Sequence, residues 1–592
     1  MRKIRIVAVL VLAAATASAG DSGASAAGAG AVTHARIQAA KDDTGNWMLH
    51  GRTYEDQRFS PATQITPSNA HLLGLAWHTD IDSPDGLNAA PIVVDGVIYI
   101  SAPLSKVYAI DANSGAIKWN YDPKVVLDTT LVGSYASRVN RGVAVWEGKV
   151  FVATGDCRLI ALDAATGRPV WSVVGCDVKK SYYKNAAPRV GGGLVFTGSG
   201  GSEFGARGFV DAFRADTGKR IWRFYTVPSP DGNQESEALK MAAKTWTGDP
   251  KKIEGGTVWD AMTYDPELDS LYFGTAGAVP MSHHERSPKG GDNLFLESIV
   301  AVKASTGQYL WHYQTTPEDS YDFNANFHMI LADLDIKGRK HKVLMTAPKN
   351  GYFYTLDRTN GKLLSIGPFA RATWASKIDP VTGRPTWNRA VLPENLAAGK
   401  CFTMYPGGWG AHNWHAMSYS PLEMLVYLPV ANLGRKTCKG QDGKIHSEDI
   451  MIPDEQAGSK GDLVAWDPVA AKARWRLSRV TPYNGGTMVT AGGVVFEGTG
   501  NGLFEAVAAD TGKLLWSYKV GSGIHGAPVS VVLGGRQYVF VVAGESTLMS
   551  TYLPALTGTP DATGPARVLA FTLGGNGSLY MEIGRASCRE RV

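Results

Sequence analysis

Cysteine and charge are both scarce in this chain. It has 592 residues but only 5 Cys, and Asp, Glu, Lys and Arg together make up 19% of it. The absence of a Cys-x-x-Cys-His motif excludes covalent attachment of a c-type haem within this sequence. The net charge of +5 comes without a clustered basic stripe, so we do not expect nucleic-acid binding.

Long hydrophobic runs are also lacking, apart from Ile6–Ala15 near the N-terminus. This run is too short to span a bilayer, so we expect no integral membrane segment. Cations at positions 2, 3 and 5 precede it, and Ala17-Ser-Ala19 follows it as a cleavage site, with Ala24-Ser-Ala26 as a second candidate. We therefore predict a signal peptide over residues 1–19, a flexible linker over 20–40, and a periplasmic or secreted protein.

What the chain does have is a repeated phrase. Ala161-Leu-Asp-Ala-Ala-Thr-Gly167 is followed by Trp171, and it predicts a strand, a tight turn and a second strand. The Gly supplies the positive φ that such a turn needs. Copies of this phrase, each with a Trp at the same offset, end at Trp119, Trp222, Trp311 and Trp516, and weaker copies contain Gly361 and Trp475.

The spacing of these copies decides the architecture. The shortest intervals between them are about 40 to 50 residues, which is the period of one four-stranded propeller blade. A recurring Trp can pack each blade against the next. With the strand around Trp77, the copies predict an all-β, eight-bladed β-propeller over residues 41–578 that closes by pairing the two chain ends. A solenoid is the alternative, but long loops between strand–turn repeats fit it poorly.

Four of the five cysteines suggest two disulfides, which an exported protein can form. Cys157 and Cys176 flank the hairpin around Gly167, and Cys401 and Cys438 bracket a long loop. We expect a disulfide in each of these pairs.

The last residues, 582–592, share nothing with the β pattern before them. They resemble translated sequencing-adaptor DNA, and an ordinary charged tail is the alternative. The adaptor interpretation implies that the natural sequence continues past Met581, with room for a C-terminal haem domain.

Several long polar segments interrupt the repeats and are candidates for building a site at one end of a propeller. They cover residues 226–256, with a helix expected over 235–244, then 279–292 and 367–401.

A set of specific stretches resembles the quinoprotein alcohol dehydrogenases, the methanol and ethanol dehydrogenase family that uses pyrroloquinoline quinone. The resemblance runs from about Asn46 to about Gly575. The stretches that carry it are Gly51-Arg-Thr-Tyr-Glu-Asp-Gln-Arg-Phe-Ser60, Val139-Asn-Arg-Gly142, Gly201-Ser-Glu-Phe-Gly-Ala-Arg-Gly208, Gly255-Gly-Thr-Val-Trp-Asp260, Gly291-Asp-Asn-Leu-Phe295, Trp311-His-Tyr-Gln-Thr-Thr-Pro317, Ala347-Pro-Lys-Asn-Gly351, Gly410-Ala-His-Asn-Trp-His415 and Asn484-Gly-Gly-Thr487.

The resemblance implies a pyrroloquinoline quinone site on the propeller axis. Trp259 matches the residue on which the quinone stacks, and an indole face suits a flat ring system. Glu203 matches a carboxylate that ligates calcium, or a lanthanide in some members, since hard cations take oxygen ligands. The other matched contacts are cationic or hydrogen-bonding residues, namely Arg141, Lys349, Thr257, Asn413, Asn185 and Asn484.

The chain departs from the family pattern at several positions. Within the repeat phrase, the resemblance places the family's catalytic Asp at Lys303, and it places a metal-binding Asn at Gly277. An acidic residue near the quinone falls on Asn88, and a vicinal cysteine pair falls on Tyr135-Ala136. The Trp-rich loop that covers the cofactor is not visible in Val541–Leu548.

Three interpretations of Lys303 follow. Its ammonium replaces the metal and pairs with Glu203, in which case a base must come from His283, His284 or Glu285. Alternatively the site has decayed, or Lys303 forms only a structural ion pair. Alcohol oxidation needs a base for the hydroxyl proton, and a Lys is protonated at its ordinary pKa.

Two function classes remain open. The first is a periplasmic pyrroloquinoline quinone-dependent dehydrogenase that oxidises a small-molecule alcohol and passes electrons to a cytochrome c or a similar acceptor. The second is a catalytically impaired propeller that serves as a binding or scaffold protein. The matched cofactor contacts favour the first, and the departures at the base and metal positions favour the second.

Overall fold

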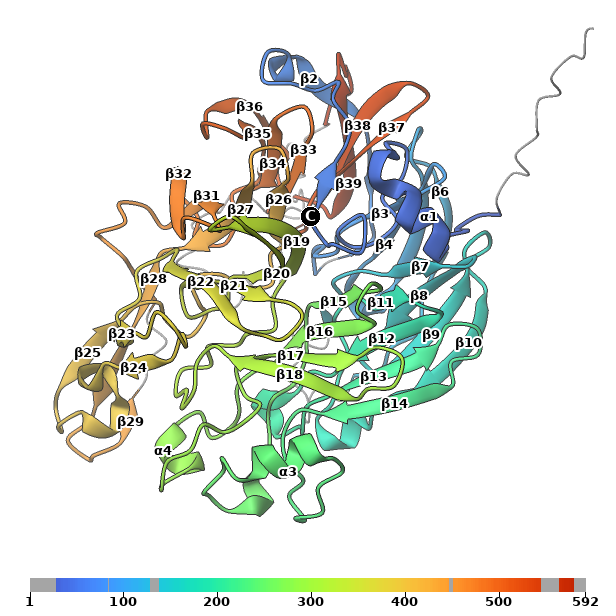
Figure 1. Cartoon of the computed structure of the whole chain (residues 1–592). Helices are drawn as coiled ribbons and strands as arrows, with labels where there is room; N and C mark the ends of the chain where they lie inside the picture. Colours follow the sequence, from blue (N-terminus) through green and yellow to red (C-terminus); the bar gives the residue numbers. More distant parts are fainter. Residues whose placement is uncertain (1–27, 84, 128–137, 447–450, 545–563, 580–592) are drawn as a thin grey trace, which may run out of the picture.

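The computed structural model describes residues 28–83, 85–127, 138–446, 451–544 and 564–579. Within them, eight sheets form the blades of a propeller, seven antiparallel with four strands and one with a fifth strand, β1, that pairs in parallel at its edge. Figure 1 shows the blades following one another around a ring in chain order, from β3–β6 in blue to β37–β39 in red. The predicted all-β, eight-bladed propeller is confirmed.

The first four blades follow one another without interruption by another sheet. Their strands are β3 (Ile92–Val94), β4 (Val97–Ser101), β5 (Val107–Asp111) and β6 (Ile117–Tyr121); β7 (Ala144–Trp146), β8 (Lys149–Ala153), β9 (Arg158–Asp163) and β10 (Pro169–Val174); β11 (Arg189–Gly191), β12 (Leu194–Gly198), β13 (Phe209–Arg214) and β14 (Arg220–Tyr225); and β15 (Met262–Asp265), β16 (Ser270–Gly274), β17 (Ser298–Lys303) and β18 (Tyr309–Gln314).

The last four blades include the closure and an added edge strand. Their strands are β19 (Met329–Ile336), β20 (Arg339–Thr346), β21 (Tyr352–Asp357) and β22 (Leu363–Pro368); β26 (Ser418–Ser420), β27 (Leu425–Ala431), β31 (Gly461–Asp467) and β32 (Lys472–Arg479); β1 (Phe59–Ser60), β33 (Thr487–Thr490), β34 (Val494–Gly498), β35 (Leu503–Ala508) and β36 (Leu514–Lys519); and β37 (Val529–Leu533), β38 (Arg536–Ala543), β39 (Arg567–Leu573) and β2 (Leu73–Asp80).

The ring closes by pairing segments from the two ends of the chain. β2 is the outermost strand of the last blade and runs antiparallel to β39, with Trp77 opposite Ala570. This closure is the one that the strand around Trp77 predicts. Because β2, from near the start of the chain, completes the last sheet, the ends of the ring are held together by a full ladder of backbone hydrogen bonds.

The repeated Trp packs one blade onto the next at six of the eight junctions between blades. Trp119 lies against Gly167, the turn glycine of the following repeat, and a Cβ added there would meet the indole at 2.6 Å. The Trp119 indole N–H also donates to the Ala164 carbonyl of that turn, at 3.0 Å. The same docking on glycine joins the pairs Trp77–Gly115, Trp171–Gly218, Trp222–Gly307, Trp311–Gly361 and Trp475–Gly512.

The N-terminal segment differs from the predicted linker over residues 20–40. Helix α1 (His34–Gln38) begins at the N-cap Thr33, and a 3₁₀ turn, η1 (Ala39–Asp42), follows it. Val32 and Ile37 are buried against the blade of β7–β10. The linker prediction is therefore wrong from residue 28 on, because two apolar side chains anchor this segment. The predicted signal peptide lies outside the described residues, as does the tail at 582–592.

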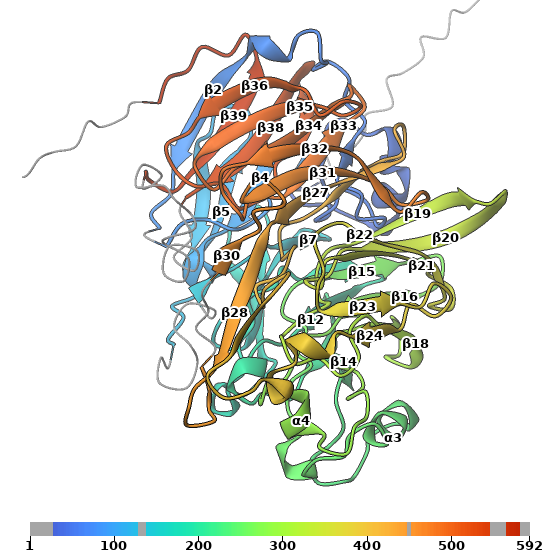
Figure 2. The same cartoon turned by 90° about the vertical axis from the view of Figure 1, so that its left-hand side faces the viewer.

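The polar insertions carry most of the remaining elements. Helix α3 (Glu237–Ala243) lies within the helix expected over 235–244, and α4 (His283–Arg286) lies in the next insertion. Figures 1 and 2 both show these two helices together at one end of the molecule. The other elements are the strands β23 (Ala375–Ile378), β24 (Pro385–Trp387), β25 (Cys401–Met404), β28 (Leu433–Lys439), β29 (Ile445–His446) and β30 (Met451–Pro453), and the 3₁₀ turns η2 (Ala70–Leu72), η3 (Pro103–Ser105), η4 (Val178–Lys180), η5 (Ser202–Phe204), η6 (Pro250–Lys252), η7 (Arg389–Val391) and η8 (Pro393–Asn395).

Both predicted disulfides are present. Cys157 bonds Cys176, with their Cα atoms 5.1 Å apart, and Cys401 bonds Cys438 across the β25–β28 pair. Within the described ranges, no helix combines the length and the apolar character that crossing a membrane requires.

The docking of Trp on glycine can be tested at Gly307, whose φ is +73° and whose added Cβ would lie 2.7 Å from Trp222. We expect Gly307→Ala to lower the free energy of unfolding by about 2–4 kcal/mol, because it combines left-handed strain with overpacking. Gly193→Ala is the matched control, since Gly193 has φ +75° and open space around it. Its loss should be only about 1–2 kcal/mol. Equal losses in denaturant titrations of both variants would contradict the docking role.

Candidate functional site

The predicted site residues lie in loops on one face of the propeller. In a blade of antiparallel strands, the connections that leave its second and fourth strands lie on one face, and the turns after its first and third strands lie on the other. All eight predicted cofactor contacts follow a second or fourth strand: Arg141, Asn185, Glu203, Thr257, Trp259, Lys349, Asn413 and Asn484.

Arg141 is buried between two aromatic rings. Its guanidinium carbon lies 4.9 Å from the Trp259 ring centroid and 5.2 Å from that of Trp414. The Nε and Nη1 groups have no hydrogen-bond acceptor among the described residues, and the nearest carboxylate, Asp260, is 3.7 Å from Nε. Buried N–H groups without a partner are costly, so this cation is suited to an anionic ligand beside the Trp259 ring.

A carboxylate that the sequence analysis missed lies in the same region. Asp322, in the β18–β19 loop, accepts a hydrogen bond from the Lys349 ammonium at 2.7 Å. Its φ is +62°, a left-handed conformation that is uncommon outside Gly and often marks functional sites. The buried Asp319 fixes this conformation, because its carboxylate accepts hydrogen bonds from the backbone N–H groups of residues 321, 322 and 323.

Glu203 is held close to this carboxylate by the short turn η5. The preceding residue, Ser202, exchanges a 2.6 Å hydrogen bond with the Thr257 hydroxyl and accepts one from the Thr257 N–H. The Glu203 side chain remains open to solvent on this face. Even so, desolvation by the surrounding protein raises its pKa, the Asp322 charge raises it further, and Lys349 opposes both effects. Glu203, Asp322 and Lys349 therefore form one electrostatic group.

Lys303 is not part of this group. It ends β17, the third strand of its blade, with an exposed side chain on the turn that leads to β18. This turn lies on the face opposite to Glu203, so the predicted pairing of Lys303 with Glu203 is wrong. The repeat phrase that led to Lys303 always forms a turn after the third strand, and no residue in that turn can reach the site.

The structure shows no side-chain contact of the alternative bases with Asp322 among the described residues. His284 and Glu285 are exposed on α4. His283 lines a different cavity, together with Ser320 and Trp387. Of the residues considered as bases, only Asp322 is shown in contact with the Lys349 ammonium.

The three predicted Asn contacts differ from one another. Asn185 lines a cavity with Trp259, and its backbone carbonyl accepts a hydrogen bond from the backbone N–H of Arg141. Asn413 donates to the Trp409 carbonyl and accepts from the Trp414 N–H, so it orients the second ring beside Arg141. Asn484 is hydrogen-bonded to Thr481 and to the Gly500 N–H, which indicates a role in its own loop.

The positions that depart from the family pattern are partly described. Asn88 is buried in the cavity that Arg141 and Asp260 line, and neither atom of its amide has a partner among the described residues. Gly277 donates its N–H to the Asn324 side chain at 2.7 Å. Tyr135-Ala136 and residues 545–548 lie outside the described residues.

The groups on this face fit the expected cofactors. Pyrroloquinoline quinone is an electron-poor ring system with three carboxylates. Trp259 and Trp414 offer aromatic faces for the ring, and Arg141 offers unpartnered cationic N–H groups for a carboxylate. Glu203 and Asp322 supply the oxygen donors that a hard cation takes.

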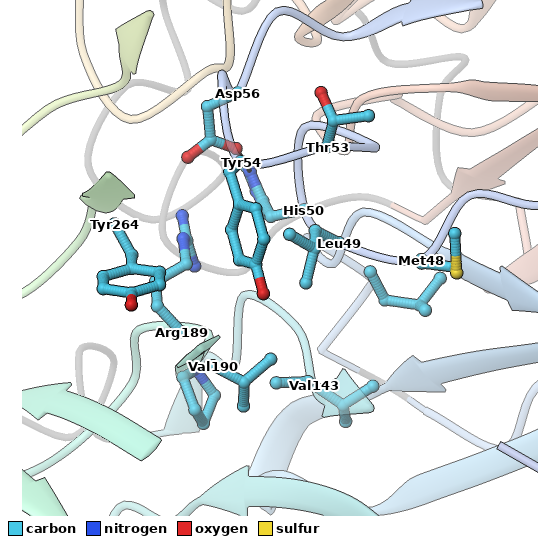
Figure 3. Close-up of a pocket in the computed structure, with 13 residues that line it drawn as sticks. Met48, Leu49, His50, Thr53, Tyr54, Asp56, Val143, Arg189, Val190 and Tyr264 are labelled. Atoms are coloured by element: carbon cyan, nitrogen blue, oxygen red, sulfur yellow. Dashed lines mark ion pairs between the residues drawn. The ribbon is translucent and has the colours of Figure 1, made fainter. Parts of the chain in front are cut away.

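A second group of residues that could hold a metal consists of His50, Asp56 and His328. His50 and His328 each place a ring nitrogen 3.9 Å from the same Asp56 oxygen. Figure 3 shows His50 and Asp56 at the edge of a pocket that Tyr54 and Arg189 also line. The Met417 N–H donates to His328 Nδ1, so the proton of the neutral ring is on Nε2, the atom that faces Asp56. A metal ligand needs a free lone pair there, so this group is a poor metal site.

Comparisons with known proteins agree with this geometry. The family model described as "Glucose/ethanol/alcohol dehydrogenase, beta-propeller domain" matches residues 47–366 and 453–539. Quinohemoprotein alcohol dehydrogenase ADH IIB of Pseudomonas putida is 47% identical over 93% of this chain and 80% of its own length. Lupanine 17-hydroxylase [cytochrome c] of a Pseudomonas species is 44% identical over 90% and 78%.

Solved structures extend this similarity to three dimensions. The structure of quinohemoprotein alcohol dehydrogenase ADHIIG from Pseudomonas putida HK5 superposes with a TM-score of 0.87 at 44% identity, over 94% of this chain and 84% of that one. A europium-containing methanol dehydrogenase superposes with a TM-score of 0.82 at 31% identity, over 91% and 100%. Together with the propeller and the Trp259–Arg141 site, these similarities do not favour the scaffold alternative, and the chain belongs to the pyrroloquinoline quinone-dependent alcohol dehydrogenase family.

Proposed function

We propose that the protein is a periplasmic dehydrogenase that oxidises an alcohol at the Glu203–Asp322–Lys349 group and passes the electrons to a cytochrome. The observation that carries this proposal is the position of Asp322. Its backbone is left-handed, and its carboxylate is paired with Lys349 on the face that holds Arg141 and Trp259. Pyrroloquinoline quinone, when bound, supplies the two-electron acceptor for the hydride of the alcohol.

Asp322 is the catalytic residue of this proposal. Its carboxylate accepts the hydroxyl proton of the alcohol, as general-base catalysis requires. Lys349 keeps this carboxylate in place, since the ammonium donates a 2.7 Å hydrogen bond to Oδ2. Asp319 acts one step further away, because it holds the backbone N–H groups of the loop that carries Asp322.

The cofactor contacts divide between ring and charge. Trp259 provides a flat apolar face, and Arg141 binds a carboxylate of the quinone through the N–H groups that lack a protein acceptor. Glu203 and Asp322 hold a hard cation through oxygen atoms. Asn185, Thr257 and Asn413 support these groups through the contacts described above. This leaves Asn484 with a structural role.

The electron acceptor and the compartment are inferred from sequence and relatives. The N-terminal charges and the apolar run are typical of an exported protein. The name of one relative includes cytochrome c, and others are named quinohemoproteins. A c-type cytochrome is therefore the expected acceptor.

The proposed function is tested by reconstituting the purified protein with pyrroloquinoline quinone and Ca²⁺ or La³⁺. Trp fluorescence measures quinone binding, and reduction of an artificial dye measures alcohol oxidation. We expect Asp322→Asn to lower kcat by at least about 100-fold. Lys303→Ala is the control and should change kcat less than about twofold, because its exposed turn lies on the other face.

Three outcomes would contradict the proposal. Retained activity in Asp322→Asn would remove Asp322 as the base, and loss of activity in Lys303→Ala would contradict the placement of Lys303 away from the site. Failure of the wild-type protein to bind quinone under any condition would favour the scaffold function instead.

The burial of Asp260 makes the stability of the cofactor-free protein depend on pH. Burial raises the pKa of Asp260 to about 7, although Arg141 and Arg189 oppose the shift. The unfolded chain ionises Asp260 near its ordinary value of 3.8, so folding favours the protonated form. This contribution to stability is therefore present at low pH and is lost as the pH rises through about 7.

We expect the free energy of unfolding of the cofactor-free protein to fall by roughly 2 kcal/mol more in the wild type than in Asp260→Asn between about pH 5 and pH 8. Denaturant titrations at the two pH values measure this difference. Asp379→Asn is the control, because backbone hydrogen bonds from Thr382 and Val381 lower the pKa of Asp379 and move its titration below this range. An equal pH dependence in all three proteins would refute the role of Asp260.

A further inference from the structure

Glu297 is a buried carboxylate that the proposed mechanism does not use. It lies in the β16–β17 connection, 1% exposed, and its Oε1 atom has no hydrogen-bond partner among the described residues. Its φ is +44°, in the left-handed region where non-glycine residues are rare. Both features are unfavourable for folding, and such features tend to persist at functional sites.

The unpartnered oxygen points to the open side of Gly277. A Cβ at residue 277 would lie 2.8 Å from Glu297 Oε1 and 2.9 Å from Asp322 Oδ1. Because Gly277 has no side chain, these two carboxylate oxygens border one shared volume. The Gly277 N–H is bonded to Asn324, and the Asn324 amide in turn contacts Asp322 Oδ2 at 3.4 Å.

The charges around this volume are not balanced. Asp322 lies within electrostatic reach of three other carboxyl groups, because its charge raises the pKa of Glu203, Glu297 and Asp319. Burial, followed by the charge of Asp319, raises the pKa of Glu297 well above its ordinary value, although the nearby Arg286 guanidinium opposes the shift. Lys349 pairs with Asp322, and Arg286 donates to the carbonyls of residues 280, 281 and 319 and to Asn293. A multivalent cation between the carboxylates would supply the missing charge.

We propose that Glu297 is a metal ligand of this chain, reaching the ion across the open side of Gly277 to complete a three-carboxylate site with Asp322 and Glu203. Three carboxylate ligands carry three negative charges, and even with the Lys349 ammonium beside Asp322 their net negative charge attracts a trivalent ion more strongly than a divalent one. The site therefore selects a trivalent lanthanide over Ca²⁺. The proposal rests on the proposed function, because the same carboxylates flank the catalytic Asp322.

The test measures metal binding directly. Metal-free protein is titrated with Tb³⁺, read by Trp-sensitised luminescence, and with Ca²⁺, read by calorimetry, both without and with quinone. We expect Glu297→Gln to weaken Tb³⁺ binding by at least about tenfold and to weaken Ca²⁺ binding less, because it removes one ligand charge. Glu267→Gln is the control, since Glu267 is an exposed partner of Lys342 on the blade surface, and it should change neither affinity.

A double substitution separates ligation from simple damage to the fold. Gly277→Asn alone should weaken Tb³⁺ binding, because its Cβ crowds both oxygens. Adding Glu297→Ser opens space for the new amide oxygen, so the double variant should bind Ca²⁺ at least as tightly as the wild type and should lose the preference for Tb³⁺. Thermal unfolding shows which variants remain folded.

The outcomes distinguish this proposal from the proposed function. Unchanged Tb³⁺ and Ca²⁺ affinities in a folded Glu297→Gln variant would overturn the metal-ligand role, because Glu297 would then be only a protonated buried acid. Quinone binding, followed separately by Trp fluorescence, could still be intact in that case. If wild-type protein instead binds Tb³⁺ through Glu297 but no quinone, the metal site stands and the dehydrogenase proposal fails.

Discussion

The contact of a Trp ring with the turn glycine of the next blade is the interaction on which the structure depends. It recurs from Trp77 on Gly115 to Trp475 on Gly512, and it leaves no room for a side chain at the glycine. Each contact fixes the angle between two neighbouring blades. Because the ring must also close through β2 and β39, a small change in one angle is carried to the axis. The site residues come from several blades, so their convergence follows from this contact.

The same contact explains how much of the fold could be predicted from sequence. A glycine and a Trp at fixed spacing repeat visibly, and the spacing gives the number of strands per blade. The helix α1 was not predicted, because the burial of Val32 and Ile37 against the blade of β7–β10 leaves no periodic pattern in so short a segment. Tertiary packing decided its conformation.

The site was predicted in part, for a reason that follows from strand direction. Arg141, Glu203, Trp259 and Lys349 were identified by resemblance, and the structure places them in loops on one face. Lys303 was chosen because it lies within the most recognisable repeat, but repeats of this kind mark turns that dock on a neighbouring Trp. Asp322 lies in the β18–β19 loop, where no repeat exists, and its left-handed backbone cannot be read from sequence. The one sequence feature that could have indicated Asp322 is the place of its loop after the fourth strand of a blade, on the same face as the other site residues.

Buried charge then sets what the site can bind. Folding holds Glu203, Glu297 and Asp319 within electrostatic reach of Asp322, and repulsion between these carboxylates opposes folding unless protons or cations compensate. The rigid ring supplies the free energy that holds them there, since each loop is anchored at both ends to a blade. An ion that binds to these carboxylates relieves their repulsion. Binding is therefore favoured by an unfavourable electrostatic energy that the cofactor-free fold already contains. The glycine at position 277 leaves the volume into which two of these carboxylates can direct their oxygens.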